Sequence, residues 1–155
     1  MRKYKEYIIS VLLALGVGGL SAFLTRNYMN IYEDIIKPPL SPPMIVFPIV
    51  WSALFILMGI SSARVYKACD GGEECGFSLK LYAIQLVVNF FWSIIFFRMR
   101  AFLFAFIWLI LLLVLVIWMI IEFYKTDKTA AYLQIPYVLW LLFAGYLSLM
   151  VYILN

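Results

Sequence analysis

The sequence has no histidine and few charged residues, and each shortage excludes certain classes of function. Without histidine the chain cannot carry out Ser-His-Asp hydrolysis, bind a metal through imidazole or ligate a haem iron through histidine. Charged residues form 13% of the 155 residues, against about a quarter in soluble globular domains. Together with the mean hydropathy of +1.02, this shortage of charge excludes an ordinary soluble domain.

Apolar residues instead form five long stretches, whose approximate ranges are 7–24, 46–66, 79–97, 101–123 and 130–154. A helix of ~20 residues, rising about 1.5 Å per residue, crosses the ~30 Å hydrocarbon layer of a bilayer. Because a bilayer offers no water to backbone groups, and membrane strands are shorter and alternate in polarity, stretches of this length must be helices. The sequence therefore predicts an all-α integral membrane protein, a single bundle of five transmembrane helices that forms one domain over residues 1–155.

None of these stretches has a charged residue in its middle. Ion-coupled transporters and small multidrug exporters generally need an intramembrane carboxylate to carry the proton or cation. The lack of such a group disfavours an ion-coupled pump. It leaves a binding protein, a facilitator or an unconventional enzyme.

Basic residues divide unequally between the two sides of the predicted bundle. Eight lie on the side of the N-terminus and four on the other side; they are Arg2, Lys3, Lys5, Arg64, Lys67, Lys80, Lys125 and Lys128 against Arg26, Lys37, Arg98 and Arg100. The positive-inside rule places the N-terminus in the cytoplasm and the C-terminus outside, across the cell membrane if the protein is bacterial. Because the cations are spread over two sides, they give no support to nucleic-acid binding.

Cys69 and Cys75 lie in the acidic loop CDGGEEC, with five residues between them. This spacing allows a metal clip, a disulfide or two free thiols. Two thiolates without any histidine make an incomplete zinc set, and a cytoplasmic loop is kept reduced. We therefore expect two free loop thiols and no metal site.

A polar stripe distinguishes the stretch 79–97. Gln85, Asn89 and Ser93 recur every fourth residue, so they share one face of a helix, and Trp92 lies beside them. Polar side chains in a membrane span face the bundle rather than lipid. The stripe serves interhelical hydrogen bonding, ligand contact or both, and the pattern alone does not choose between them.

The first loop, residues 25–45, is rich in proline. Pro38, Pro39, Pro42 and Pro43 cannot continue a helix and hold the chain extended. A stiff, apolar segment of this kind is either a linker or a lid that packs over the bundle.

Three separated motifs carry a resemblance to a known family. They are KPPLSPP at 37–43, followed by VW at 50–51, then LYAIQLVVNFFWSIIFF at 81–97, and finally PYVLWLLFAGYLSLMVYILN at 136–155. In this order they resemble the TspO/MBR family of tryptophan-rich sensory proteins and peripheral benzodiazepine receptors. The resemblance implies five transmembrane helices and a homodimer in membrane lipid. It also implies a pocket, capped by the first loop, for protoporphyrin IX or related tetrapyrroles and for isoquinoline carboxamide and benzodiazepine-type drugs.

By the same resemblance, the ligand-binding residues come from the first loop and from four helices. They are Tyr32, Pro42, Trp51, Phe55, Gln85, Asn89, Phe90, Phe104, Trp140, Ala144 and Leu147. The chain departs from the family at Leu40, where many relatives have tryptophan. Its C-terminus also lacks the cation of the cholesterol motif found in animal members.

We therefore expect a membrane receptor that binds porphyrins and other flat hydrophobic ligands between its helices and requires no cofactor, porphyrin being the ligand or the substrate. The resemblance leaves open a light- and oxygen-dependent degradation of the porphyrin, in which Trp51 and Trp140 flank the ring and supply redox-active indoles. Two alternatives also stay open: a facilitator that translocates tetrapyrroles or lipid, and a regulatory membrane protein that binds ligands incidentally.

Overall fold

The computed structural model describes residues 5–26, 43, 45–69 and 75–155, and its regular elements are all helices. In chain order these are α1 (Lys5–Thr25), α3 (Val46–Ala68), α4 (Gly76–Ser93) with its π-helical continuation η4 (Ile94–Arg98), α5 (Phe102–Thr126), α6 (Lys128–Leu133) and α7 (Ile135–Leu154). Five membrane-spanning helices are found within the described residues: α1, α3, α4 with η4, α5, and α6 with α7. The predicted all-α bundle of five transmembrane helices is therefore confirmed.

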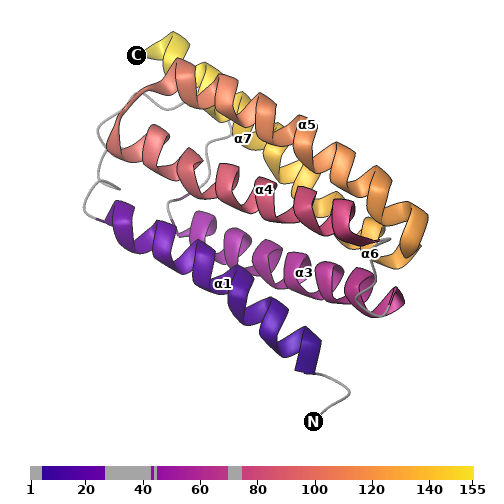
Figure 1. Cartoon of the computed structure of the whole chain (residues 1–155). Helices are drawn as coiled ribbons and strands as arrows, with labels where there is room; N and C mark the ends of the chain where they lie inside the picture. The colour runs from indigo at the N-terminus through magenta and orange to yellow at the C-terminus, as the bar shows by residue number, and fades with distance from the viewer. Residues whose placement is uncertain (1–4, 27–42, 44, 70–74) are drawn as a thin grey trace.

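The helices run back and forth along one axis, with α4 between the pair α1 and α3 and the pair α5 and α7 (Figure 1). One end of the bundle holds the start of α1 and the turn between α5 and α6. We call it the N-terminal end. The opposite end holds the C-terminus and the turn that leads from η4 to α5, and we call it the C-terminal end.

Most helices extend beyond the predicted ranges by less than one turn. The stretch 130–154 differs more, because it divides into α6 and α7 at Gln134. Pro136 lies in the first turn of α7, where its missing N–H leaves no intrahelical hydrogen bond unmade.

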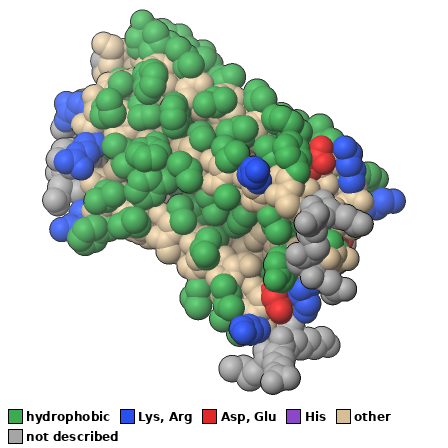
Figure 2. All heavy atoms as spheres, viewed as in Figure 1, with side chains coloured by type: hydrophobic (Ala, Val, Ile, Leu, Met, Phe, Trp, Pro, Cys, Tyr) green, Lys and Arg blue, Asp and Glu red, His purple; other side chains and the backbone are tan. Residues whose placement is uncertain are grey.

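The outer surface of the bundle is apolar. Hydrophobic side chains cover much of the visible face, and basic side chains lie mainly toward the two ends (Figure 2). Large apolar side chains such as Leu12, Val114 and Leu142 are exposed along the middles of their helices. A surface of this kind is stable against lipid rather than water.

Two glycines allow α1 to pack closely on α3. A Cβ atom at Gly59 would lie 2.5 Å from the Cα atom of Val11, and one at Gly18 would overlap the ring of Phe55. Small residues at helix contacts let backbones approach in lipid, where dispersion rather than the hydrophobic effect holds helices together.

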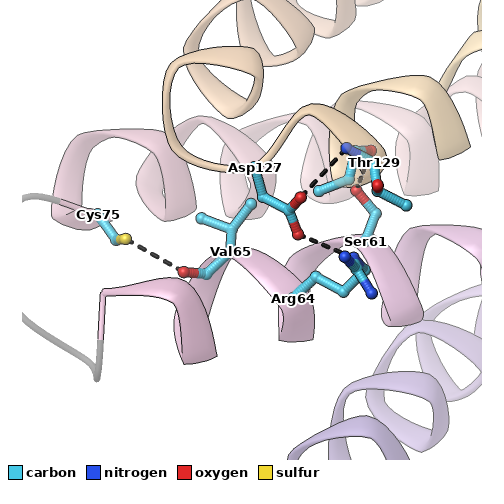
Figure 3. Close-up of polar contacts among 7 residues, drawn as sticks. Ser61, Arg64, Val65, Cys75, Asp127 and Thr129 are labelled. Atoms are coloured by element: carbon cyan, nitrogen blue, oxygen red, sulfur yellow. Dashed lines mark hydrogen bonds and ion pairs between the residues drawn. The ribbon is translucent and has the colours of Figure 1, made fainter.

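The expectation of two free thiols is wrong, because Cys69 and Cys75 form a disulfide. Cys69 follows the last residue of α3 and Cys75 precedes the first residue of α4. The two Cα atoms are 6.4 Å apart, within the range that a disulfide spans. The sulfur of Cys75 lies 3.2 Å from the carbonyl oxygen of Val65, so the bridge packs onto the last turn of α3 (Figure 3).

Polar contacts also join α3 to α6 at the N-terminal end (Figure 3). Arg64 Nε lies 2.8 Å from Asp127 Oδ2, while Asp127 Oδ1 accepts a hydrogen bond from the backbone N–H of Thr129 at 3.1 Å. One turn earlier on α3, Ser61 Oγ donates to the carbonyl oxygen of Ala130 at 2.7 Å. These contacts hold the α5–α6 turn against α3.

Candidate functional site

A cavity of about 90 Å³ lies between α1, α3 and the α4–η4 helix, toward the C-terminal end of the bundle. Its walls are formed by Gly18, Ser21, Ala22, Thr25, Phe47, Pro48, Trp51, Phe55, Asn89, Trp92, Ser93 and Phe97. It lies beside the end of α1 and the start of α3, the two helices that the first loop joins in the sequence.

Aromatic rings make up one wall of the cavity and the layer behind it. The ring centroid of Trp51 lies 5.8 Å from that of Phe55 and 6.3 Å from that of Trp92. On the other side of Trp51, the rings of Tyr137 and Trp140 pack edge-on at 6.2 Å each. Trp51 is therefore the central ring of the cluster, and Trp140 lies behind it as seen from the cavity.

A chain of hydrogen bonds leads from the cavity into the bundle. Asn89, which lines the cavity, donates through Nδ2 to the hydroxyl oxygen of Tyr137 at 2.6 Å. The hydroxyl of Tyr137 in turn donates to Gln85 Oε1 at 2.8 Å. The polar stripe of α4 thus binds α7, as interhelical hydrogen bonding requires, and Asn89 also faces the cavity.

Trp92 is a cavity residue that the sequence-based site did not include. Its side chain is 5% exposed, and its indole N–H is buried with no hydrogen-bond partner among the described residues. A buried donor without a partner costs free energy unless a ligand or water accepts its hydrogen bond. The sequence held a signal, because Trp92 follows Gln85 by seven residues and so shares its helix face.

The π-helical turn η4 brings further aromatic residues into the site. Ile95, Phe96 and Phe97 are buried in succession, which the 3.6-residue period of an α-helix does not allow on a single face. Phe97 reaches the cavity, and Phe96 stacks on Trp92 with centroids 5.3 Å apart. No sequence pattern indicated this wider turn.

Three of the predicted site residues, Trp51, Phe55 and Asn89, line the cavity. Gln85 is completely buried one turn further along α4. Leu147 is buried against a cluster that contains Trp51.

The other predicted residues lie elsewhere. Ala144 is buried in the main core, whereas Phe104 is half exposed and packs on Trp108, away from the cavity. Phe90 accepts a hydrogen bond from Ser21 through its carbonyl oxygen, and its side chain is not a wall of the cavity. Tyr32 and Pro42 lie outside the described residues.

The walls of the cavity carry groups that can bind a ligand. In the described ranges, no cluster of three or more His, Cys, Asp or Glu residues is arranged to hold a metal ion. What the cavity offers is aromatic surface and the amide of Asn89. Fold and site together define an integral membrane protein of five helices with an aromatic internal pocket.

Comparison with known proteins places this architecture in a family. Residues 9–154 match the sequence profile of the TspO/MBR family, and the chain belongs to that family. It is 35% identical over 147 residues to the tryptophan-rich protein TspO of Chlorobaculum tepidum, covering 95% of this chain and 92% of that protein.

Two further relatives come from different kinds of organism. The protein CrtK of Rhodobacter capsulatus is 36% identical over 124 residues, which are 80% of this chain and 78% of CrtK. The translocator protein of Bos taurus is 33% identical over 141 residues, which are 90% of this chain and 83% of the bovine protein. The similarity therefore extends over nearly the whole bundle and includes the helices that form the cavity.

Proposed function

We propose that the protein is a membrane receptor that binds porphyrins, such as protoporphyrin IX, and other flat hydrophobic ligands in the cavity between α1, α3 and α4. The rings of Trp51 and Trp92, together with the amide of Asn89 in the same cavity wall, carry the proposal. A flat conjugated ligand stacks on indole rings, and a carboxylate or carbonyl at its edge accepts a hydrogen bond from the side-chain amide of Asn89. The family membership supports this reading, since relatives in the family include proteins named for tryptophan and for translocation.

The cavity must widen to admit such a ligand. Small-molecule pockets usually enclose about 300 Å³ or more, whereas this cavity holds about 90 Å³. The rings of Phe97 and Trp51 in the cavity wall can move by rotation of their side chains. The helices α1 and α3 cannot separate as easily, because their backbones are in close contact at Gly59. We expect the ligand to displace aromatic rings rather than to part these two helices.

A second candidate function is the light- and oxygen-dependent degradation of the bound porphyrin. The observation that favours it is the chain of three indoles, Trp92, Trp51 and Trp140, with successive centroids 6.3 and 6.2 Å apart. In this proposal dioxygen is the oxidant, and Trp51 and Trp140 are the oxidisable side chains. A third candidate, translocation of a tetrapyrrole or lipid, is favoured by the name of the bovine relative.

The test is a titration of the purified full-length protein with protoporphyrin IX, first in darkness and then under illumination in air. Tryptophan quenching reports binding, and the porphyrin absorbance bands report turnover. We expect saturable quenching that an isoquinoline carboxamide or a benzodiazepine-type drug reverses. Crosslinking of the purified protein in lipid bilayers tests whether it forms the homodimer that the family resemblance implies.

Three matched Trp→Phe variants separate receptor from enzyme. Phenylalanine keeps an aromatic face but loses the indole N–H and its ease of oxidation. Trp51→Phe and Trp140→Phe should retain most of the binding and, if the protein is an enzyme, lose most light-driven turnover. The control is Trp118→Phe, since Trp118 lies on α5 with 46% of its surface exposed and outside the cavity walls.

If porphyrin does not quench the tryptophan fluorescence saturably, the proposed receptor function is wrong. Equal turnover in all three variants would exclude the indoles from the chemistry. Saturable binding without the absorbance bands of a new product would support the receptor function and exclude the enzymatic one.

A further inference from the structure

Two buried side chains on the N-terminal side of the cavity have polar atoms that no described residue satisfies. Gln134 is 0% exposed, and neither its carboxamide oxygen nor its carboxamide nitrogen has a hydrogen-bond partner there. The hydroxyl of Tyr82 is also buried; the side chain of Ser62 lies near it, but no described residue makes a hydrogen bond of good geometry to it. Unpaired carboxamide and hydroxyl groups in the interior of a membrane protein are costly, because neither lipid nor apolar side chains can accept or donate a hydrogen bond.

Helix geometry places these two side chains at one level of the bundle. Tyr82 precedes Gln85 by three residues on α4, and Gln134 precedes Tyr137 by three residues, so each lies about one turn closer to the N-terminal end. The turn at Gln134 is continuous with α7, since the backbone N–H of Tyr137 donates to the carbonyl oxygen of Gln134 at 3.1 Å. Because Tyr137 and Gln85 are hydrogen-bonded to each other, the side chains one turn below them face the same part of the interior.

Polar groups continue beyond that level to the surface. Ser61 on α3 lies about one turn from Met58, which contacts Gln85, and it donates to the carbonyl oxygen of Ala130. One turn further, Arg64 pairs with Asp127, and the Arg64 side chain is 36% exposed. Buried polar groups therefore recur turn by turn from Asn89 at the cavity to Arg64 at the N-terminal end.

We propose that Gln134 and Tyr82 bind internal water, and that this water completes a hydrogen-bonded path from the ligand cavity to the N-terminal end of the bundle. Buried water typically makes about three hydrogen bonds to polar groups that are otherwise unsatisfied. A carboxamide with two donors and an acceptor, together with a hydroxyl at the same level of the bundle, provides partners of both kinds. The side-chain segment of the path is Asn89, Tyr137 and Gln85.

The path gives the cavity a route for proton exchange with the aqueous phase at the N-terminal end. Asn89 lies in the cavity wall, and each step away from it is either a hydrogen bond or one helical turn. The path does not depend on which ligand the cavity binds.

The experiment is solid-state NMR on the full-length, isotopically labelled protein in lipid bilayers. Transfer of magnetisation from water to the side-chain amide of Gln134 detects the bound water. Exchange of the Gln85 and Asn89 side-chain amide protons with D₂O measures the connection to the aqueous phase.

We expect water transfer to Gln134 in the unmodified protein. In Gln134→Leu, which has a similar volume and no polar group, amide exchange at Gln85 and Asn89 should slow severalfold. Tyr82→Phe removes a single hydroxyl, and we expect it to slow the same amide exchange. This variant tests the path if Gln134→Leu does not fold.

The matched control is Ser148→Ala. Ser148 is also fully buried on α7, and its hydroxyl has no hydrogen-bond partner in the part of the chain that the structure describes, but it lies about 20 Å from Gln134 along the helix. It should leave exchange at Gln85 and Asn89 unchanged. Absence of water transfer to Gln134 would overturn the water site, and unchanged exchange in both Gln134→Leu and Tyr82→Phe would overturn the path.

Discussion

Gly59 determines how closely α1 can approach α3. The backbone of Val11 occupies the place where a Cβ atom of residue 59 would lie, at 2.5 Å. Backbone atoms cannot rotate away as a side chain does, so any substitution at this position must move a helix. Gly18 is a softer case, because the atoms near it belong to the flexible ring of Phe55.

Gly59→Ala should lower the free energy of unfolding by about 1 to 3 kcal/mol, the usual cost of overpacking a close contact. Thermal unfolding in detergent, followed by tryptophan fluorescence, measures the change. Gly19→Ala is the control, since no atom of another described helix lies within 4 Å of the place that its Cβ would take and alanine is the better helix former by ~1 kcal/mol. Equal stability of Gly59→Ala and the unmodified protein would mean that α1 shifts on α3 without loss.

Trp92 shows how one residue type serves two purposes in this bundle. Its ring stacks on Phe96 as part of the core and also lines the cavity. The same indole therefore stabilises the fold and forms part of the cavity wall.

At the scale of elements, the short helix α6 depends on a single carboxylate. Asp127 precedes α6 and caps it through Oδ1, while its other oxygen pairs with Arg64 on α3. A helix of six residues has little stability of its own, so these two contacts, with the hydrogen bond from Ser61 to the carbonyl oxygen of Ala130, hold it in register.

Asp127→Ala should therefore lower stability more than Asp127→Asn. Alanine loses the N-cap, worth about 1 kcal/mol, and also the ion pair, which in this partly exposed setting contributes no more than about 1 kcal/mol. Asparagine keeps an oxygen that can cap the helix. Unfolding at low and high salt checks the assignment, because screening weakens the ion pair and not the cap.

High salt should slightly lower the free energy of unfolding of the unmodified protein, because it screens the Arg64–Asp127 pair. The two variants lack this pair, so salt should not change their stability in this way. If Asp127→Asn were as unstable as Asp127→Ala, the ion pair rather than the cap would hold α6.

At the scale of the whole molecule, two features bear on which way the bundle faces. The excess of basic residues at the N-terminal end predicts that this end is cytoplasmic. The Cys69–Cys75 disulfide lies at the same end, and disulfides persist in oxidising compartments. We give priority to charge, since it acts while the helices insert, whereas a disulfide forms afterwards.

A reporter that is active only outside the cytoplasm should therefore be active when fused after residue 155. Blocking free thiols in intact cells before lysis then measures how much of the Cys69–Cys75 pair is bridged under cytoplasmic conditions. Activity of a cytoplasmic reporter at the same position would reverse the orientation. It would place the cavity near the cytoplasm and the bridge in the oxidising compartment.

The number and type of the helices followed from the sequence, because crossing a bilayer is a local requirement. Each apolar stretch must satisfy its own backbone and match the thickness of the hydrocarbon, whatever its neighbours do. The three motifs at 37–43, 81–97 and 136–155 likewise predicted the family, and they led to Trp51, Phe55 and Asn89, which line the cavity.

Which residues meet was decided only by the tertiary structure. The disulfide depends on where α3 ends and α4 begins, and the place of Trp92 and Phe97 in the cavity depends on the π-helical turn and on α1 packing across them. The polar atoms of Gln134 have no partner among the described residues because of the helices packed around it, and no local sequence pattern predicts that packing. Hydropathy and helix period act along the chain, whereas cavities, bridges and buried hydrogen bonds depend on distances between helices, and those distances exist only once the bundle is packed.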